Sequence, residues 1–222
     1  MAKDTKDYPG AARFVPGDDA RLPELAEAAR SCQGCDLYER ATQTVFGRGD
    51  ENARFVLIGE QPGDQEDKRG LPFVGPAGAL LDRALAEAGI DPGETYVTNA
   101  VKHFRWKSAP DRGKRRIHEK PGTTHINACR PWLLAELSRL RPEVIVLLGA
   151  TAGQSLFGSG FRVGKSRGVP VDWQPPEGAG PGAKAVATVH PSAVLRAPDR
   201  DTAYAGLLAD LRTCAELAGR LD

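Results

Sequence analysis

An apolar run from Phe55 to Ile58 leads directly into a loop rich in glycine and acidic residues, GEQPGDQED, which is followed by GLPFVGPAG. Four apolar residues bounded by turn formers predict a buried strand, and a helix is expected to begin at about Pro76. In an open α/β sheet, ligands bind where such a strand ends in a glycine-rich loop. A phosphate-binding loop would present backbone amides without acids, so phosphate binding is the weaker interpretation.

The same alternation of strand and helix continues along the chain. Apolar runs predict strands at 54–59, 95–101, 142–149 and 185–189, and helical periodicity predicts helices at 22–30, 76–88, 124–140, 150–156 and 202–218. This alternation predicts a three-layer α/β/α sandwich with a four-stranded, mostly parallel sheet. Residues 1–20 are polar and are expected to form a flexible N-terminal arm, and residues 21–222 a single domain.

The charge of the chain is unevenly distributed. The net charge of +1 is not that of a globally basic nucleic-acid binder, but residues 102–120 alone carry +6 and the remainder therefore −5. Such a loop indicates one docking place for a polyanion, although charge alone favours a merely solvated loop. No stretch approaches the roughly 20 apolar residues of a membrane span, and the N-terminus lacks a signal-peptide core. We therefore expect a cytoplasmic protein, and nothing in the sequence indicates more than a monomer.

Polar side chains follow three of the predicted strands. Glu60 and Gln61 follow the first, Asn99 lies at the end of the second, and His190 follows the last. The carboxyl ends of parallel strands share one edge, so these groups are expected to converge with Phe73 on one pocket. A carboxylate, an amide, an imidazole and an aromatic ring suit a flat, hydrogen-bonding ligand. Taken singly, the asparagine is as often a turn former and the histidine a structural cap.

Four motifs together carry a resemblance. GEQPGDQED with GLPFVGPAG, then TNAVKH, then VHPSAVLR, is similar to the iron–sulfur branch of the uracil-DNA glycosylase superfamily, and the similarity extends from Cys32 to the last helix. The segment KRRIHE at 114–119 and the form GEQPG narrow the resemblance further. They resemble the UdgX type, whose members bind uracil-containing DNA and become covalently attached to it.

The resemblance implies roles in base recognition. Phe73 would stack on a flipped uracil, and Asn99 would pair with its O4 and N3–H, since an amide offers one acceptor and one donor. His190 would donate to O2, where negative charge grows as the base departs. Gln61 is expected to shape the pocket.

The resemblance also implies a fate for the sugar cation. Glu60 or Asp64 would stabilise the cation, and His118 would trap it in place of water, with Glu60 accepting the imidazole proton. The protein would then excise uracil once and remain crosslinked to the abasic site. Arg116 would hold the loop shut or grip a phosphate. From the residues alone, His118 is equally well explained as one polar residue on a solvated loop.

The cysteines indicate a metal or cluster site, because disulfides are rare in a reducing compartment. Cys32 and Cys35 have a spacing suited to one centre, which Cys129 and Cys214 could complete as a four-thiolate set. The resemblance instead implies His103 of TNAVKH as third ligand and Cys129 of ACRPW as fourth. It thus implies a [4Fe–4S] cluster, with zinc on the same ligands as the alternative.

The implied partner is uracil-containing DNA, with single strands accepted. Phosphate contacts are expected from Lys114, Arg116, Ser192 and Arg196, which would make affinity depend on salt but read no sequence. Two other functions remain open at this point. One is a conventional glycosylase in which water completes hydrolysis, and the other is a non-catalytic iron–sulfur module that binds nucleic acid.

Overall fold

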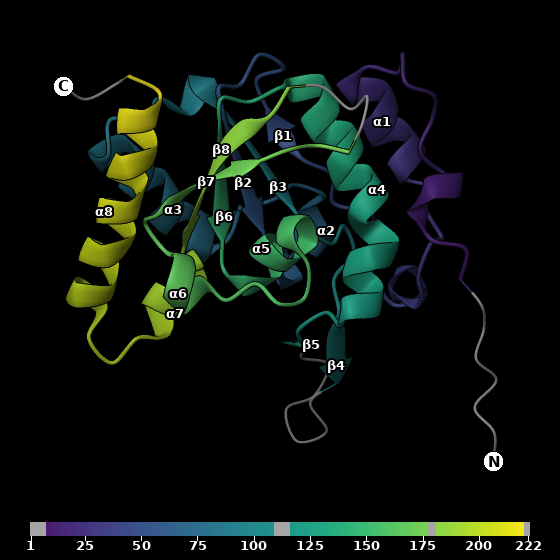
Figure 1. The fold of residues 1–222 in the computed structure, drawn as a ribbon. Coiled ribbons are helices and arrows are strands. Elements are labelled where there is room, and N and C mark those ends of the chain that lie inside the picture. The colour runs from purple at the N-terminus through teal and green to yellow at the C-terminus, as the bar shows by residue number, and fades with distance from the viewer. Residues whose placement is uncertain (1–7, 109–115, 177–180, 220–222) are drawn as a thin grey trace.

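A mixed sheet of six strands forms the centre of the molecule, in the order β1-β3-β2-β6-β8-β7 (Figure 1). The computed structural model describes residues 8–108, 116–176 and 181–219. The strands of this sheet are β1 (Arg48–Gly49), β2 (Phe55–Gly59), β3 (Thr95–Asn99), β6 (Val144–Leu148), β7 (Pro170–Trp173) and β8 (Ala183–Thr188).

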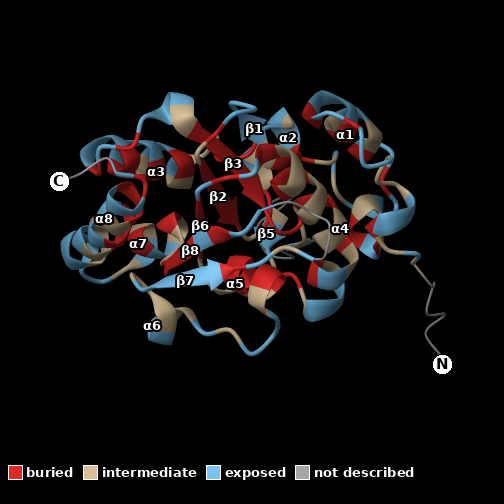
Figure 2. Ribbon diagram, turned by 45° about the horizontal axis from the view of Figure 1, so that its top comes forward, coloured by how far each residue is buried: buried red, intermediate tan, exposed pale blue. Residues whose placement is uncertain are grey.

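The four predicted strands are β2, β3, β6 and β8, and they pair with one another in parallel. The predicted number of four strands is nevertheless wrong, because β1 and β7 add antiparallel edges to β3 and β8. These edges escaped prediction because β1 has two residues, both exposed, and three of the four residues of β7 are exposed. Figure 2 shows the contrast between the buried β2 and β3 and the exposed β7.

Helices cover both faces of the sheet (Figure 1). One layer contains α3 (Pro76–Glu87), α7 (Pro191–Arg196) and α8 (Arg200–Leu217), and the other contains α1 (Leu22–Ala29), α4 (Thr123–Leu140) and α5 (Ala150–Phe157). Alternate residues of β2 serve the two layers: Val56 and Ile58 belong to the core under α1 and α4, whereas Phe55 and Leu57 belong to the core under α3 and α8. None of the helices in the described ranges has the length and apolar character that a bilayer crossing needs.

The basic segment contains a hairpin where an irregular loop was predicted. Its stem consists of β4 (Trp106–Ser108) and β5 (Arg116–His118), which pair antiparallel, and residues 109–115 between them lie outside the described residues. Trp106 pairs with His118, and Ser108 with Arg116. Arg116 and His118 are two residues apart and therefore lie on one face of the hairpin. Strands of three residues without apolar alternation left no pattern to detect.

Short helices complete the chain: α2 (Asp64–Arg69), α6 (Val163–Ser166), η1 (Ala11–Arg13), η2 (Asp36–Glu39) and η3 (Pro92–Glu94). The element η1 lies within the predicted flexible arm, but Ala11 is buried and the Gly10 amide donates to the Gly34 carbonyl at 3.0 Å. A side chain at Gly34 would meet the backbone of Gly10 and Ala11 at 2.7 Å. Residues 8–20 therefore pack against the domain, and residues 1–7 of the predicted arm lie outside the described residues.

Candidate active site

A cleft of about 660 Å³ opens at the carboxyl edge of the parallel strands. Most of the residues predicted from the strand ends line it, and the hairpin closes one side with His118. The predicted residues in its lining are Glu60, Gln61, Phe73, Asn99, His118, His190, Ser192 and Arg196. Four strand ends, the loop after β2 and the hairpin thus meet at one place, as the shared edge of a parallel sheet requires.

Phe73 and Asn99 lie side by side above Gly59, the last residue of β2. A Cβ atom at Gly59 would lie 2.3 Å from the Asn99 Oδ1 atom and 2.7 Å from the Phe73 ring. Phe73 itself has a φ of +54°, which is uncommon for a residue other than glycine and typical of functional sites. Gly78 permits this turn, because any Cβ there would overlap the Phe73 carbonyl. The glycines of the two loop motifs therefore shape the wall of the cleft.

His190 is a neutral hydrogen-bond donor in this cleft. Burial, together with the smaller effects of Arg196 and His118, lowers its pKa to about 4, so the ring is uncharged near pH 7. The backbone amide of Ser192 donates to His190 Nδ1 at 3.1 Å, so Nδ1 is the acceptor and the ring proton is on Nε2. The ring lies 6.1 Å from that of Phe73 and 23° from parallel to it.

Glu60 and His118 face each other across the cleft. Glu60 Oε1 lies 3.4 Å from His118 Nε2, and Glu60 Oε2 accepts a hydrogen bond from the Thr151 hydroxyl at 2.5 Å. Burial lowers the pKa of His118, Glu60 acts to raise it and Arg196 to lower it, with a net lowering. The imidazole is therefore mainly neutral near pH 7, which is the nucleophilic form.

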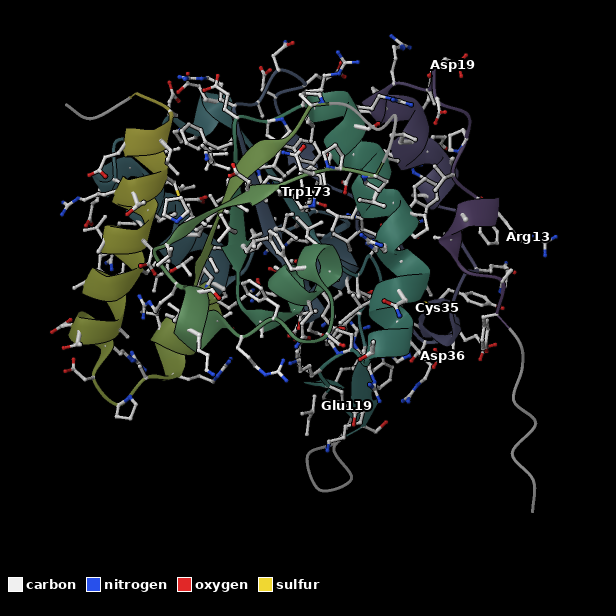
Figure 3. All side chains as sticks on the ribbon, viewed as in Figure 1. Arg13, Asp19, Cys35, Asp36, Glu119 and Trp173 are labelled. Atoms are coloured by element: carbon white, nitrogen blue, oxygen red, sulfur yellow. The ribbon has the colours of Figure 1, made fainter. Side chains whose placement is uncertain are left out.

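Gln61 holds the hairpin in place. Its amide nitrogen donates to the carbonyl oxygens of Arg105 at 3.1 Å and Glu119 at 3.0 Å, and its oxygen accepts from the Arg105 amide at 3.1 Å. Glu119, which directly follows His118, is labelled on the hairpin in Figure 3. The Gln61 amide is thus bonded to protein backbone, and its contribution to the pocket is to support the wall that carries His118.

Arg116 also anchors the hairpin, through carboxylates of α2. Its guanidinium donates to Asp64 Oδ1 and to Asp67 Oδ2, both at 2.6 Å, and to the Thr42 hydroxyl at 3.2 Å. Asp67 is fully buried and also accepts from the amide and hydroxyl of Thr42. Of the two roles predicted for Arg116, these contacts support holding the loop shut. Lys114, predicted to contact DNA, lies outside the described residues.

Asp64 does not lie where the sequence placed it. It does not line the cleft and is instead bonded to Lys68 and Arg116. Although burial acts to raise its pKa, hydrogen bonds from Lys68 and Arg116 lower it overall. Asp64 lies in the first turn of α2, and its carboxylate faces the hairpin stem, where Arg116 lies.

Three of the four cysteines gather on one side of the sheet. Cys32, Cys35 and Cys129 are buried in the core under α1 and α4, whereas Cys214 belongs to the core on the opposite face. Burial, opposed by Lys102 and aided by the nearby thiols of Cys35 and Cys32, raises the pKa of Cys129 to about 12. The sheet therefore separates Cys214 from the other three thiols, which leaves it with a packing role.

His103 was predicted to join these cysteines. It is buried, burial lowers its pKa to about 4, and its Nε2 lies 2.9 Å from the Thr44 hydroxyl. Within the described residues, no group of three or more His, Cys, Asp or Glu is arranged to hold a single metal ion. Three clustered, buried thiols in apolar surroundings nevertheless provide the soft donors that an iron–sulfur cluster takes.

Two residues of the site were missed in the sequence. Thr151 lies in the first turn of α5 and bonds to Glu60, and a threonine after a strand-ending glycine has no distinctive pattern. Glu66 accepts hydrogen bonds from the amides of Gly63, Val74 and Gly75 and so fixes the loop that carries Phe73. Its position three residues after Gly63 is that of a capping-box acid, which was the available signal.

Comparison with known proteins shows which family the chain belongs to. Residues 46–212 match the uracil DNA glycosylase superfamily. A type-4 uracil-DNA glycosylase of Thermotoga maritima is 39% identical over 174 residues, which are 78% of this chain and 82% of the relative. A type-4 uracil-DNA glycosylase of Archaeoglobus fulgidus is 34% identical over 203 residues, 90% and 94% of the two chains. A type-5 uracil-DNA glycosylase of Pyrobaculum aerophilum is 28% identical over 158 residues, 62% and 64%. The chain therefore belongs to the uracil DNA glycosylase superfamily.

Proposed function

We propose that this protein excises uracil from DNA. The observation that carries the proposal is the arrangement around Gly59: an aromatic ring, a base-reading amide and a neutral imidazole donor line one cleft at the sheet edge. The names of the type-4 relatives support the same activity. A uracil inside a duplex cannot enter such a cleft, so the nucleotide must flip out of the stack first.

The cleft residues have different roles in breaking the glycosidic bond. Phe73 stacks on the flipped base and Asn99 pairs with its O4 and N3–H. As the bond breaks, its electron pair stays with uracil, and His190 Nε2–H donates to O2 where the negative charge grows. The sugar is left as an oxocarbenium-like cation, which the Glu60 carboxylate stabilises. Arg196 and Ser192, at the mouth of the same cleft, contact the flanking phosphates.

The sugar cation is then captured either by water or by His118. The relatives are named uracil-DNA glycosylases, which favours water and a conventional, hydrolytic enzyme. One observation favours capture by His118 as a second candidate: Glu60 Oε1 lies 3.4 Å from the imidazole. In that case a ring nitrogen forms a bond to the sugar carbon, and the ring proton passes to Glu60. The protein would then act once, as the UdgX type does, and stay crosslinked.

We also propose that a [4Fe–4S] cluster is held by Cys32, Cys35 and Cys129, with His103 as the fourth ligand. The buried thiols support a soft, thiolate-bound group, and zinc on the same ligands is the alternative. When bound, the cluster would join α1 to α4 and support the fold. Anaerobically purified protein should be brown, and colourless protein containing zinc would refute the cluster.

One experiment distinguishes the candidate functions. The protein is incubated with an end-labelled, uracil-containing strand, single or double, heated in detergent and run on a denaturing gel. A retarded band indicates the crosslink to His118, and it should disappear in His118→Ala. A strand that alkali cleaves, without retardation, indicates hydrolysis by water. An unchanged strand would refute excision and leave a binding module.

Light scattering of the free protein and of the complex tests the expected monomer.

A further inference from the structure

We infer that Thr151 is a positioning residue that fixes the orientation of the Glu60 carboxylate. The inference rests on the proposed function, in which Glu60 stabilises the sugar cation. It concerns a hydroxyl that does not line the cleft and therefore acts only through Glu60. The partner of the Thr151 hydroxyl is thus a side chain of the protein. Through that side chain, Thr151 affects the step at which positive charge develops on the sugar.

The contact is short, partly buried and made between two different elements. Thr151 is 1% exposed, and its hydroxyl donates to Glu60 Oε2 at 2.5 Å. It lies in the first turn of α5, which packs on β2 and β6, while Glu60 directly follows β2. Gly149 places this turn close to the sheet edge, with a φ of +93° that favours glycine. The hydroxyl is thus held by the fold at a fixed distance from the strand end.

This bond makes the two oxygens of Glu60 unequal. Oε2 is occupied by the Thr151 hydroxyl, so Oε1 is the oxygen that faces His118 at 3.4 Å. The terminal torsion of a glutamate is broad and has no strongly preferred value of its own. A charge-assisted hydrogen bond is about twice as strong as a neutral one and can fix that torsion. Without it, the carboxylate can rotate away from the position at which the cation forms.

The test compares Thr151→Val, which keeps the shape but lacks the hydroxyl, with Thr151→Ser, which restores it. Uracil release is measured under single-turnover conditions with saturating DNA. Because a hydrogen bond to a charged group contributes about 1.5–3 kcal/mol, release by Thr151→Val is expected to be at least about tenfold slower. The serine variant should be close to wild type, and DNA affinity should change little in either, because Thr151 does not line the cleft.

The control is Thr95→Val, which removes another buried threonine hydroxyl at the start of β3, the opposite end of the sheet. Thermal unfolding is recorded for all variants. Equal losses of rate in Thr95→Val and Thr151→Val, or release by Thr151→Val at the wild-type rate, would overturn the inference. If the wild type releases no uracil, the proposed function itself has failed.

A second readout needs no activity. The groups that act on the His118 titration are Glu60, which raises its pKa, Arg196, which lowers it, and the neighbouring His190. If Thr151 keeps Glu60 turned toward His118, the NMR titration midpoint of His118 should fall in Thr151→Val and recover in Thr151→Ser. An unchanged midpoint in the valine variant would show that Glu60 keeps its orientation without the hydroxyl, and the inference would be wrong.

Discussion

Replacing Arg116 by methionine should release the hairpin that carries His118 while leaving the base-binding wall of the cleft intact. The guanidinium side chain is 13% exposed and its partner Asp67 is 0% exposed, whereas Asp64 is 36% exposed. Removing one member of a buried ion pair costs about 3–5 kcal/mol, and an exposed pair contributes about 0.2–1 kcal/mol. The Asp67 pair dominates, and a loss of about 3 kcal/mol raises the detached fraction of the hairpin roughly a hundredfold.

Hydrogen exchange measures this change directly. The Glu119 amide, which donates to the Arg105 carbonyl at 3.0 Å across the hairpin stem, should exchange roughly a hundredfold faster in Arg116→Met. If the protein crosslinks to DNA, adduct formation should slow in proportion to the loss of the attached fraction of the hairpin, while uracil release is largely kept. The reason is that Phe73, Asn99 and His190 come from the sheet edge and its loops rather than from the hairpin.

Arg105→Met provides the matched control on the same hairpin. Its side chain is 35% exposed, and its ion pair with Glu119 is longer, at 3.6 Å. Loss of a surface ion pair costs at most about 1 kcal/mol, so exchange of the Glu119 amide should rise by no more than about fivefold in this variant. Equal effects of the two substitutions, or slow exchange of the Glu119 amide in Arg116→Met, would refute the argument that the buried carboxylate anchors the hairpin.

Three further predictions concern the cleft and the cysteines. Gly59→Ala should reduce uracil release by at least about tenfold without unfolding the protein, because its methyl group displaces Phe73 and Asn99, the two side chains proposed to contact the base; release at the wild-type rate would exclude the crowding seen there. Arg196→Gln removes a cation that lowers the pKa of His118, so the acidic limb of the pH–rate profile at saturating DNA should shift to higher pH. If the limb does not move, the His118 titration does not control the reaction rate. Cys214→Ser should keep any brown colour and Cys129→Ser should lose it, as visible absorbance will show, and the reverse result would place the cluster on the other face of the sheet.

The parallel centre of the sheet and the meeting of the strand-end side chains at one cleft could be predicted from the sequence because each has a strong local pattern. Val144 to Leu148 is a continuous apolar run that is fully buried in the structure, and Glu60, Asn99 and His190 lie at or just after the ends of other predicted strands. Strand ends in a parallel sheet meet at one edge, so three positions far apart in the chain could be placed together.

The hairpin and its supports could not be predicted, because they depend on contacts between distant residues. Gln61 lies in a strong motif, yet its amide bonds with backbone 44 and 58 residues later in the chain. Asp64 was assigned to the pocket for its charge, but the structure pairs it with Arg116, 52 residues away. Charge and spacing indicate which groups are available, and only the fold decides which of them meet.

Glu60 and Gln61 are neighbours in the chain, and so are His118 and Glu119. Gln61 bonds to the Glu119 carbonyl at 3.0 Å and Glu60 Oε1 lies 3.4 Å from His118, so the two dipeptides close a small ring of contacts. The spacing of acid and imidazole therefore depends on contacts within these four residues, in addition to the bonds from Thr151 and Arg116. Inserting a single residue into either dipeptide would break this ring.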